Sequence, residues 1–505
     1  MNRRTFVATA LAGASLAPFA ALAPVRAALQ TTGAVDVVER FGFVPDGRTD
    51  NYDAFHRFAA EVNRRGGGRY VFPPGTYYVG RYRGEPGRAE VRNSVLRGCD
   101  GLALSGAGAK ILLNGRYHRG PGQGRLKSSF MPFDLWNCRN VRISGFEIDG
   151  GVRNMTRDPG TTEIYSHLIA LNGCVDVVLE DLDLHHSQTD GVYLYQAGFS
   201  PRARAGTACR NVTLTNVRCH NNARGGLAAL NVYGLLATDC RFSENGTTGL
   251  GTYRGHAPGF GVDVEPDQFN ASDVDVKTGN LEFRRCQFND NISAILAAYA
   301  GRYRGYLRVI DCTSSNRFGH PNHMIVAWPG ALVQGGRHDA GKGTVWTAWQ
   351  QERGGDLTLR GTEILTSGLY GVFHAFPGNL VRLEDVRITG THSEPGTHGI
   401  VLGIQADPGG GRRNVLRGCE IFIPAARRSR KLAYDYEVSL HRTLSEGNLF
   451  RTDLPAAGGA HFCTEYAAGT VARGDRYRGT APGPGDSFRP YHMARHDSRQ
   501  PFSKG

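Results

Sequence analysis

Two short polar segments of this 505-residue chain carry the side chains that glycosidic bond cleavage requires. Residues 185–191 read HHSQTDG and contain Asp190, and residues 261–267 read GVDVEPD. Because strand side chains alternate between two faces, Asp263 and Glu265 share one face of the second segment. A pair of carboxyl groups cleaves glycosides when one is protonated and releases the leaving oxygen, while the other is ionised and activates water or attacks the sugar. These three acids are therefore the candidate catalytic residues.

Their neighbours suggest a division of roles. We assign Asp263 as the general acid and Asp190 as the base, because a second carboxylate such as Glu265 raises the pKa of its neighbour and keeps the proton on it. Two structural interpretations stay open. Asp190 can cap a turn, and the acidic run that includes Asp267 can be a solvated edge or a Ca²⁺ site. The hydrolase interpretation needs no cofactor and assigns no metal ligand.

The sequence also offers residues for substrate binding. Exposed aromatic rings stack on the C–H faces of sugars, and cations hold acidic groups. The candidates are Asp267, Arg224, Tyr193, Tyr253, His323 and Trp328. Aromatic packing under surface insertions is the alternative for the rings. Arg224 also suits a polysaccharide lyase, in which it acts as the base beside a uronic acid carboxylate held by Ca²⁺.

An internal repeat supplies the elements that position these residues. Nine segments share one pattern, starting at Val141, Val177, Val212, Leu235, Leu281, Leu307, Leu357, Val381 and Asn414. Their first and third residues are mostly apolar, which is typical of strands. The fifth residue is Gly, Asp or Asn in all but one segment, where it is Arg285, and these three types tolerate a sharp bend. Each unit is thus predicted to be a strand, a bend and a second strand.

The spacing of the repeats favours a parallel β-helix. The starts lie 23 to 50 residues apart, too close for strand–helix–strand units, and variable insertions account for the spread. The intervals of 46 residues after Leu235 and 50 residues after Leu307 each have room for one more coil. Since stacked coils are about 4.8 Å apart, one or two coils would separate Asp190 from Asp263 by roughly 5–10 Å.

Cysteine and asparagine recur at fixed places in these units. Seven cysteines are expected to form ladders of small buried groups rather than disulfides or a metal site, because no CxxC spacing occurs: Cys138, Cys174, Cys209, Cys240, Cys286, Cys312 and Cys419. Asn222, Asn245 and Asn291 each lie ten residues into their segments. Asparagine adopts left-handed backbone conformations readily, so we expect these three to form turns.

The segment before the repeat carries a recognisable opening. Residues 41–80 combine FGFVPDGRTD, a helical stretch to about Arg65, a Gly-Gly-Gly run and the strand YVFPPGTY. This opening, followed by the coils, resembles the pectate-lyase-like superfamily. The resemblance covers roughly residues 36–450 and implies an all-β fold, a right-handed parallel β-helix with an N-terminal capping helix. Residues 188–190 are similar to the Asn-Thr-Asp motif of polygalacturonases, with Gln188 in place of Asn, whereas Arg224 and Gly225 stand where that family has paired aspartates.

The ends of the chain and its charge suggest an exported protein. Residues 1–27, with adjacent Arg3 and Arg4, resemble a twin-arginine signal peptide, which predicts a periplasmic or secreted location. We divide the rest into a cap with first coils at 28–135, the β-helix at 136–455 and a basic Gly/Pro-rich tail at 456–505. The net charge of +13 favours a polyanionic partner, here an acidic polysaccharide. No nucleic-acid-binding module occurs, and no apolar run of membrane-spanning length follows the signal. A non-catalytic carbohydrate-binding protein remains the rival class.

Overall fold

The computed structural model describes residues 33–81, 94–114, 130–154, 166–200, 205–246, 248–250, 253–254, 259–265, 278–297, 303–318, 322–326, 328, 330–346, 356–367, 370–374, 378–390, 399–404, 407–423, 436–452, 465–466 and 470–478. The chain divides into two units, Met1–Ala34 and Val35–Gly505, and the coils all lie in the second. The expected signal peptide lies outside the described residues. None of the described helices has the length and apolarity that crossing a membrane requires.

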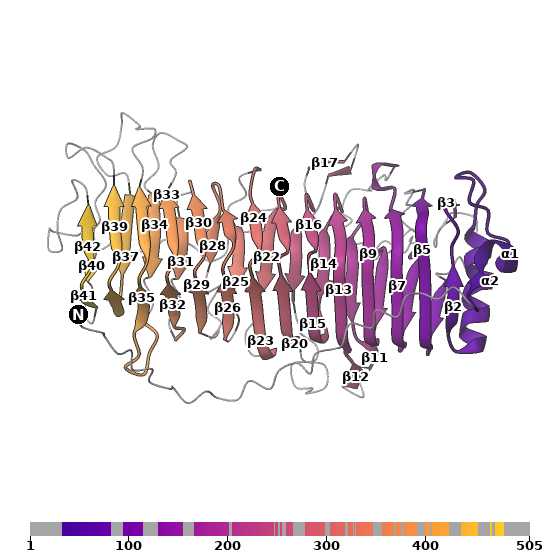
Figure 1. Cartoon of the computed structure of the whole chain (residues 1–505), viewed down its shortest axis with the longest axis horizontal. Coiled ribbons are helices and arrows are strands. Elements are labelled where there is room, and N and C mark those ends of the chain that lie inside the picture. Colours follow the sequence, from indigo (N-terminus) through magenta and orange to yellow (C-terminus); the bar gives the residue numbers. More distant parts are fainter. Residues whose placement is uncertain are drawn as a thin grey trace, which may run out of the picture. The chain divides into compact units, whose positions relative to one another are not determined.

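Parallel strands wind through the second unit in chain order (Figure 1). One face is a 13-stranded parallel sheet among the described residues, to which each coil adds one strand. Its strands are β4 Val95–Arg97, β6 Phe133–Trp136, β8 Ile169–Asn172, β10 Asp190–Tyr195, β14 Gly225–Ala229, β19 Phe260–Val264, β22 Ser293–Ala297, β25 Asn322–Val326, β28 Thr344–Trp346, β31 Tyr370–His374, β34 Gly399–Ile404, β37 Tyr436–Leu440 and β40 Glu465–Tyr466.

The remaining faces belong to one 25-stranded sheet that is folded along the bends. Four long strands run through the bend: β5 Asp100–Leu113, β7 Arg139–Asp149, β9 Val175–His185 and β13 Cys209–His220. Strands before the bend are β2 Gly68–Val71, β15 Val232–Thr238, β20 Thr278–Arg284, β23 Tyr303–Ile310, β26 Ala331–Gln334, β29 Leu357–Arg360, β32 Val381–Glu384, β35 Asn414–Arg417, β38 Thr443–Glu446 and β41 Val471–Arg473. Strands after it are β3 Gly75–Val79, β16 Arg241–Ser243, β21 Gln287–Asn289, β24 Thr313–Ser315, β27 Arg337–Asp339, β30 Glu363–Thr366, β33 Arg387–Gly390, β36 Glu420–Ile423, β39 Leu449–Thr452 and β42 Arg476–Arg478. The first strand, β1 Val35–Asp36, pairs with β2.

The register of these strands confirms the repeat. Val141, Val177, Val212 and Leu235 are consecutive pairing partners in neighbouring coils, and the later starts continue the same column. The fifth residue of every predicted segment has a positive φ, between 50° and 78°, so the bend is a single left-handed residue. Arg285 adopts this conformation too, with φ 50°. The parallel β-helix predicted from the sequence is therefore confirmed at the level of individual residues.

The two long intervals have different explanations. The 50-residue interval contains the extra coil that its length allowed, because β26 lies between β23 and β29. The 46-residue interval contains none: Leu235 pairs directly with Leu281, so the additional residues form an insertion. The winding also passes the expected boundary at residue 455. Beyond it, β40, β41 and β42 pair with the strands of the preceding coil, so part of the expected tail belongs to the β-helix.

The asparagine column has a different role from the expected one. The left-handed residues are Asn221, Glu244 and Asp290, one position earlier. Asn222, Asn245 and Asn291 are buried, and each side chain bonds to the next: Asn222 Nδ2 donates to Asn245 Oδ1 at 3.0 Å, and Asn245 Nδ2 donates to Asn291 Oδ1 at 2.9 Å. The side-chain carbonyl oxygens of these asparagines also accept hydrogen bonds from backbone N–H groups of the preceding coil. The ladder thus satisfies corner backbone groups that burial would otherwise leave unpaired.

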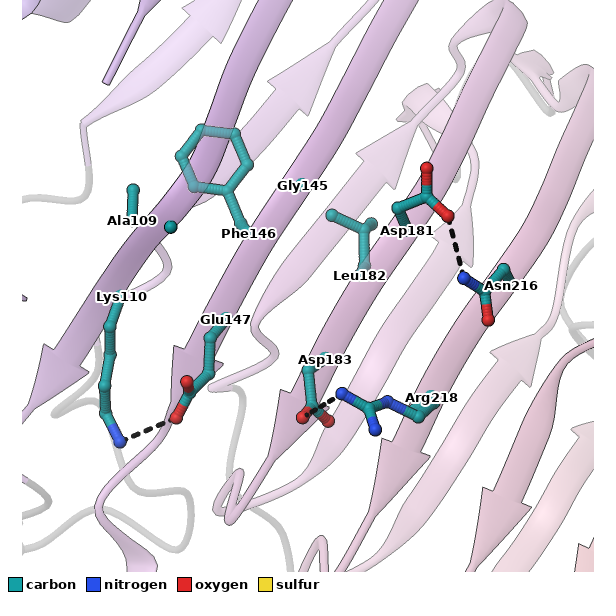
Figure 2. A pocket seen from close by; sticks show the side chains of 11 residues that line it. Ala109, Lys110, Gly145, Phe146, Glu147, Asp181, Leu182, Asp183, Asn216 and Arg218 are labelled. Atoms are coloured by element: carbon teal, nitrogen blue, oxygen red, sulfur yellow. Dashed lines mark hydrogen bonds and ion pairs between the residues drawn. The ribbon is translucent and has the colours of Figure 1, made fainter. Parts of the chain in front are cut away.

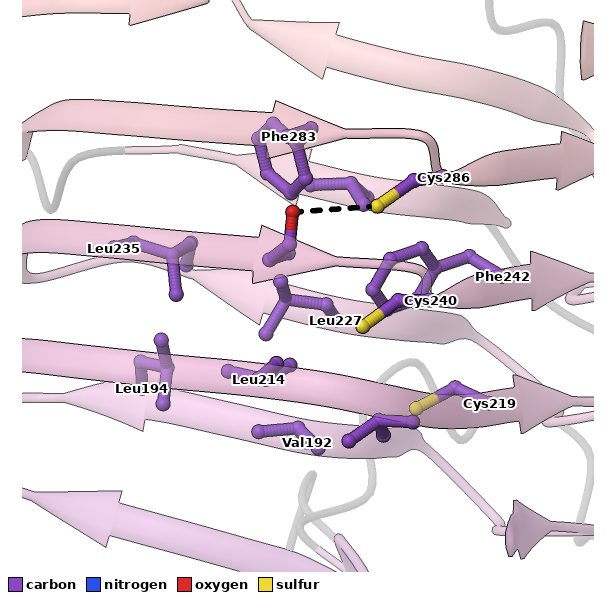
Figure 3. Close-up of a cluster of buried hydrophobic side chains, with 14 of the residues drawn as sticks. Val192, Leu194, Leu214, Cys219, Leu227, Leu235, Cys240, Phe242, Phe283 and Cys286 are labelled. Atoms are coloured by element: carbon purple, nitrogen blue, oxygen red, sulfur yellow. Dashed lines mark hydrogen bonds between the residues drawn. The ribbon is translucent and has the colours of Figure 1, made fainter. Parts of the chain in front are cut away.

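The interior of the coils is one continuous apolar core. Leucine, valine and phenylalanine side chains from successive coils fill it, together with Cys219, Cys240 and Cys286 (Figure 3). Nine cysteines are described, and all nine are free and buried, which agrees with the ladder interpretation. Eight of these nine thiols donate to a backbone carbonyl, as Cys286 Sγ does to Ala237 O of the preceding coil at 3.5 Å. The cysteines therefore act as small core side chains.

Two helices precede the coils, where the sequence predicts one capping helix. α1 (Val37–Phe41) begins at Asp36, whose carboxylate accepts the N–H of Val38 at 2.8 Å. α2 (Tyr52–Arg65) ends at Gly66, which has a left-handed φ of 72°. The apolar face of α2 is buried, and Phe55 lies 4.9 Å from Phe43 and 5.5 Å from Phe130 between ring centroids. Further short elements are η1 Val152–Asn154 and the hairpins β11 Ala197–Ser200 with β12 Ala205–Thr207 and β17 Thr248–Leu250 with β18 Tyr253–Arg254.

Candidate active site

Asp190 and Asp263 lie two strands apart in the 13-stranded sheet, on β10 and β19 with β14 between them. The outward row of this sheet reads Tyr193, Ala228 and Asp263 in register. Asp190 is the first residue of β10 and pairs with Gly225. A side chain at Gly225 would place its Cβ 2.8 Å from Asp190 Oδ1, so any larger residue would displace the carboxyl group of Asp190. The coils therefore bring together acids that are 73 positions apart in the sequence.

Arg224 connects the two acids. It lies in the turn before β14, and its Nη1 is 3.7 Å from Asp190 Oδ2 while its Nη2 is 3.8 Å from Asp263 Oδ2. Because one planar guanidinium reaches both, the two carboxyl groups are separated by no more than about 10 Å. Burial opposes the charge on Arg224, but Asp190 and Asp263 outweigh it and raise the pKa of the guanidinium. The two acids thus favour the charged form of Arg224.

The surroundings of Asp263 favour its protonated form. The residue is 3% exposed, and neither of its carboxyl oxygens has a hydrogen-bond partner among the described residues. Burial raises the pKa of Asp263 well above its usual value, and the nearby charges of Glu265 and Asp190 raise it further, against the opposing effect of Arg224. Glu265 follows β19 directly and is partly buried. A buried, protonated carboxyl group beside a second acid is the arrangement that a general acid needs.

His167 belongs to the same site and was not predicted from the sequence. Its Nδ1 lies 3.2 Å from Asp190 Oδ2, and its ring stacks on Tyr193 with centroids 4.0 Å apart. Burial lowers the pKa of His167, only partly offset by Asp190. His167 precedes β8, so it meets Asp190 from the preceding coil. The sequence did hold one signal for it, since aligning Ile169–Asn172 with the other second strands puts His167 beside Asp190.

The predicted substrate-binding residues do not all join this site. Tyr193 does, through its contact with His167 and a second stacking on Tyr195 at 5.5 Å. Trp328 does not: it is completely buried in the core, where no sugar can stack on it. His323 is also buried, with Nε2 2.7 Å from Ser314 Oγ, and burial together with His338 lowers its pKa to about 3. Asp267 and the side chain of Tyr253 lie outside the described residues.

The comparisons with known proteins identify the fold. Residues 133–327 match the family model described as right-handed beta helix region. Together with the parallel pairing of the coils, this match confirms a right-handed parallel β-helix and supports the resemblance to the pectate-lyase-like superfamily. No curated protein matches the sequence.

Several solved structures are similar at low identity. The mannuronan C-5 epimerase AlgE4 A-module of Azotobacter vinelandii is 15% identical, with a TM-score of 0.41, and the match covers 88% of this chain and 96% of that one. The Agl-KA catalytic domain is 12% identical, with a TM-score of 0.46 and coverages of 89% and 67%. The tailspike protein of E. coli bacteriophage HK620, in complex with a pentasaccharide, is 11% identical, with a TM-score of 0.49 and coverages of 87% and 78%.

Proposed function

We propose that this right-handed β-helix protein is a glycoside hydrolase that cleaves a polysaccharide with Asp263 as general acid and Asp190 as general base. The observation that carries the proposal is the contrast between the two acids joined by Arg224. Both acids lie near Arg224, but Asp263 is buried without hydrogen bonds and has a strongly raised pKa, whereas Asp190 also has the ring of His167 beside it. Two carboxyl groups in different environments are what acid–base cleavage of a glycoside uses.

The chemistry follows from these positions. Asp263 gives its proton to the glycosidic oxygen as the bond to the anomeric carbon breaks, and Asp190 accepts a proton from the water that attacks this carbon. Glu265 keeps the proton on Asp263 before the reaction. Exchange with solvent then restores the starting protonation states. The net charge of +13 supports an acidic polysaccharide as substrate, and the N-terminal pattern supports export to the periplasm or medium.

A polysaccharide lyase is the second candidate, favoured by His167. A neutral imidazole that is oriented by Asp190 and stacked on Tyr193 is equipped to remove the proton beside a uronic acid carboxylate. In that reaction the C–H proton moves to His167, a carbon–carbon double bond forms and the glycosidic oxygen leaves. The base would thus be His167 rather than Arg224.

One assay separates these functions. The protein is incubated with a panel of acidic and neutral polysaccharides, and both reducing ends and absorbance near about 235 nm are followed, because only elimination creates an unsaturated product. We expect new reducing ends without absorbance. Asp263→Asn should lower kcat by about 10²- to 10⁴-fold, since the proton donor is lost with little change in shape. Asp239→Asn is the matched control, because Asp239 is an exposed bend residue far along the coil from the site.

Other outcomes of this assay contradict the hydrolase. Absorbance that depends on His167 identifies a lyase. Tight binding without cleavage, unchanged in Asp263→Asn, identifies a carbohydrate-binding protein.

A further inference from the structure

A second polar region lies on the folded sheet, away from the Asp190–Asp263 site. A groove of about 520 Å³ crosses the bends of β5, β7, β9 and β13. Figure 2 shows its charged row, in which Lys110 bonds to Glu147 at 2.7 Å and Arg218 bonds to Asp183 at 2.7 Å. These lining residues already form ion pairs with one another.

The next row along the same strands carries Asp149, His185 and His220 in register, two residues beyond Glu147, Asp183 and Arg218. His186 joins this row although adjacent strand residues normally point to opposite faces. Its φ of 53° turns the chain at the end of β9, so both imidazoles lie together. Asp149, His185 and His186 each offer one ligand atom, and these atoms lie within 4.8 Å of one another.

The hydrogen bonds of this cluster define where its protons are. Arg153 Nη2 lies 2.7 Å from His186 Nε2, and arginine can only donate, so this nitrogen is the acceptor. The proton of neutral His186 is then on Nδ1, 2.6 Å from His185 Nδ1, which accepts it. His185 in turn carries its proton on Nε2 and donates to Glu147 Oε1 at 3.2 Å. One proton therefore lies between two ring nitrogens that face each other.

We infer that a divalent transition-metal ion binds in place of this proton, with Asp149, His185 Nδ1 and His186 Nδ1 as ligands. Imidazole and carboxylate suit Zn²⁺, whose ligand atoms lie about 3.3 Å apart in tetrahedral geometry. The two Nδ1 atoms, 2.6 Å apart, therefore need to separate by about 0.7 Å, and the carboxylate needs to approach by no more than about 1.5 Å. The proton of His186 moves to Nε2, and Arg153 turns away. Arg153 is exposed, so it is able to do so.

The site has the character of an open metal centre. Three protein ligands leave one coordination position, and the side chains of Asp149 and His185 are partly accessible, with 21% and 10% exposed. The donation from His185 Nε2 to Glu147 fixes the orientation of that ring, as second partners of metal-bound histidines do. A water molecule or an oxygen ligand from the groove would occupy the fourth position. This site does not depend on the proposed hydrolase activity.

Isothermal titration of the untagged chain with ZnCl₂ tests the proposal, and Co²⁺ substitution provides a spectroscopic check of the ligand geometry. We expect one ion per chain. His186→Ala and Asp149→Asn should each weaken binding by about 10- to 100-fold or more. His441→Ala is the control, since His441 lies in a turn after β37 and outside the cluster. No binding, or binding that is unchanged in His186→Ala and Asp149→Asn, overturns the proposal.

Arg153→Ala gives the sharper test. It removes no ligand but frees His186 Nε2 to take the proton, and it removes a positive charge next to the ion. We expect Zn²⁺ affinity to rise by about 10-fold or more. Tighter binding cannot come from misfolding, whereas unchanged or weaker binding would show that Arg153 does not compete with the ion for His186. Because Zn²⁺ binding is measured without substrate, its failure and the failure of the hydrolase proposal are separate results.

Discussion

At the scale of single residues, the protonation of Asp263 depends on its surroundings more than on any one partner. Its carboxyl group belongs to the outward row of the 13-stranded sheet but is nevertheless buried. It lies next to Glu265 and 3.8 Å from Arg224. Arg224 at 3.8 Å is too distant for a hydrogen bond, so it does not compensate fully for the loss of water. The proton is therefore retained for a physical reason that an exposed aspartate would lack.

This burial predicts a specific dependence of stability on pH. The pKa of Asp263 is raised in the folded state, so the folded protein binds a proton more tightly than the unfolded chain does. The contribution of Asp263 to the free energy of unfolding is therefore highest below its unfolded pKa of about 3.9 and falls as pH rises toward its folded pKa. Asp263→Asn should remove this loss. Urea unfolding of both proteins at about pH 4 and pH 7 measures it, and equal losses in the two would contradict the raised pKa.

At this scale, strand alternation and coil stacking predicted which acids lie close together, whereas three-dimensional packing decided the burial of other residues. Asp190, Asp263 and Glu265 share a site because strand alternation and stacking are regular. Trp328 and His323 were expected at the surface, yet the side chains of both are buried. His167 was missed because its contact with Asp190 is made across coils.

At the scale of elements, the left-handed bend residues and the asparagine ladder have different structural roles. Nine predicted bends are left-handed residues, and the sequence revealed them because glycine, aspartate and asparagine tolerate that conformation. For the asparagine ladder the sequence predicts turns instead, since asparagine is common both in left-handed turns and in buried ladders. Only the stacking of coils shows that Asn222, Asn245 and Asn291 bond to one another.

Removing one ladder asparagine should be costly. Asn245→Ala deprives the buried N–H and Nδ2 groups of Asn222 of their acceptor and leaves Cys219 O without its donor. Since each orphaned buried group costs about 1–3 kcal/mol, we expect a loss of roughly 3 kcal/mol in the free energy of unfolding. Asn216→Gly, at an exposed bend with φ 52°, is the control and should change it by less than about 1 kcal/mol. Similar losses in both variants would refute a special role for the ladder.

Replacing the one unfavourable bend residue should stabilise the coil. Arg285 has a φ of 50° and is exposed, with an ion pair to Asp239 at 2.8 Å. Left-handed backbone costs most residues roughly 1 kcal/mol, whereas an exposed ion pair contributes less. Arg285→Asn should therefore raise the free energy of unfolding by about 0.5 kcal/mol, measured by urea unfolding. A clear loss would mean that the ion pair outweighs the backbone preference.

At the scale of the whole molecule, stability is built from contacts between neighbouring coils, as expected for a solenoid. Nearly every strand pairs only with strands of the coils before and after it. The cap closes the first coil through α2, whose apolar face packs on Phe43 and Phe130. A mutation that destabilises the cap should therefore loosen only the first coils and not the whole β-helix.

Phe55→Ala tests this locality. Loss of a fully buried phenylalanine costs about 3–5 kcal/mol, and we expect it to loosen α2 and the first coil while the central coils keep their protection. Hydrogen exchange measured by mass spectrometry should show faster exchange in residues 52–79 and unchanged exchange in 209–243. Phe318→Ala, at a side chain that is 48% exposed, is the control. Faster exchange along the whole chain would show that the coils unfold as one unit.

The thiols stacked inside the coils have a consequence for handling the protein outside a reducing environment. While the coils are wound, core packing shields all nine described sulfurs from oxidants. Once the chain unwinds in air, thiols from different levels are free to cross-link in pairings that the coiled form cannot accommodate. Thermal unfolding would then become irreversible because new disulfides form. Whether the protein refolds would depend on the presence of a reductant and not on the rate of cooling.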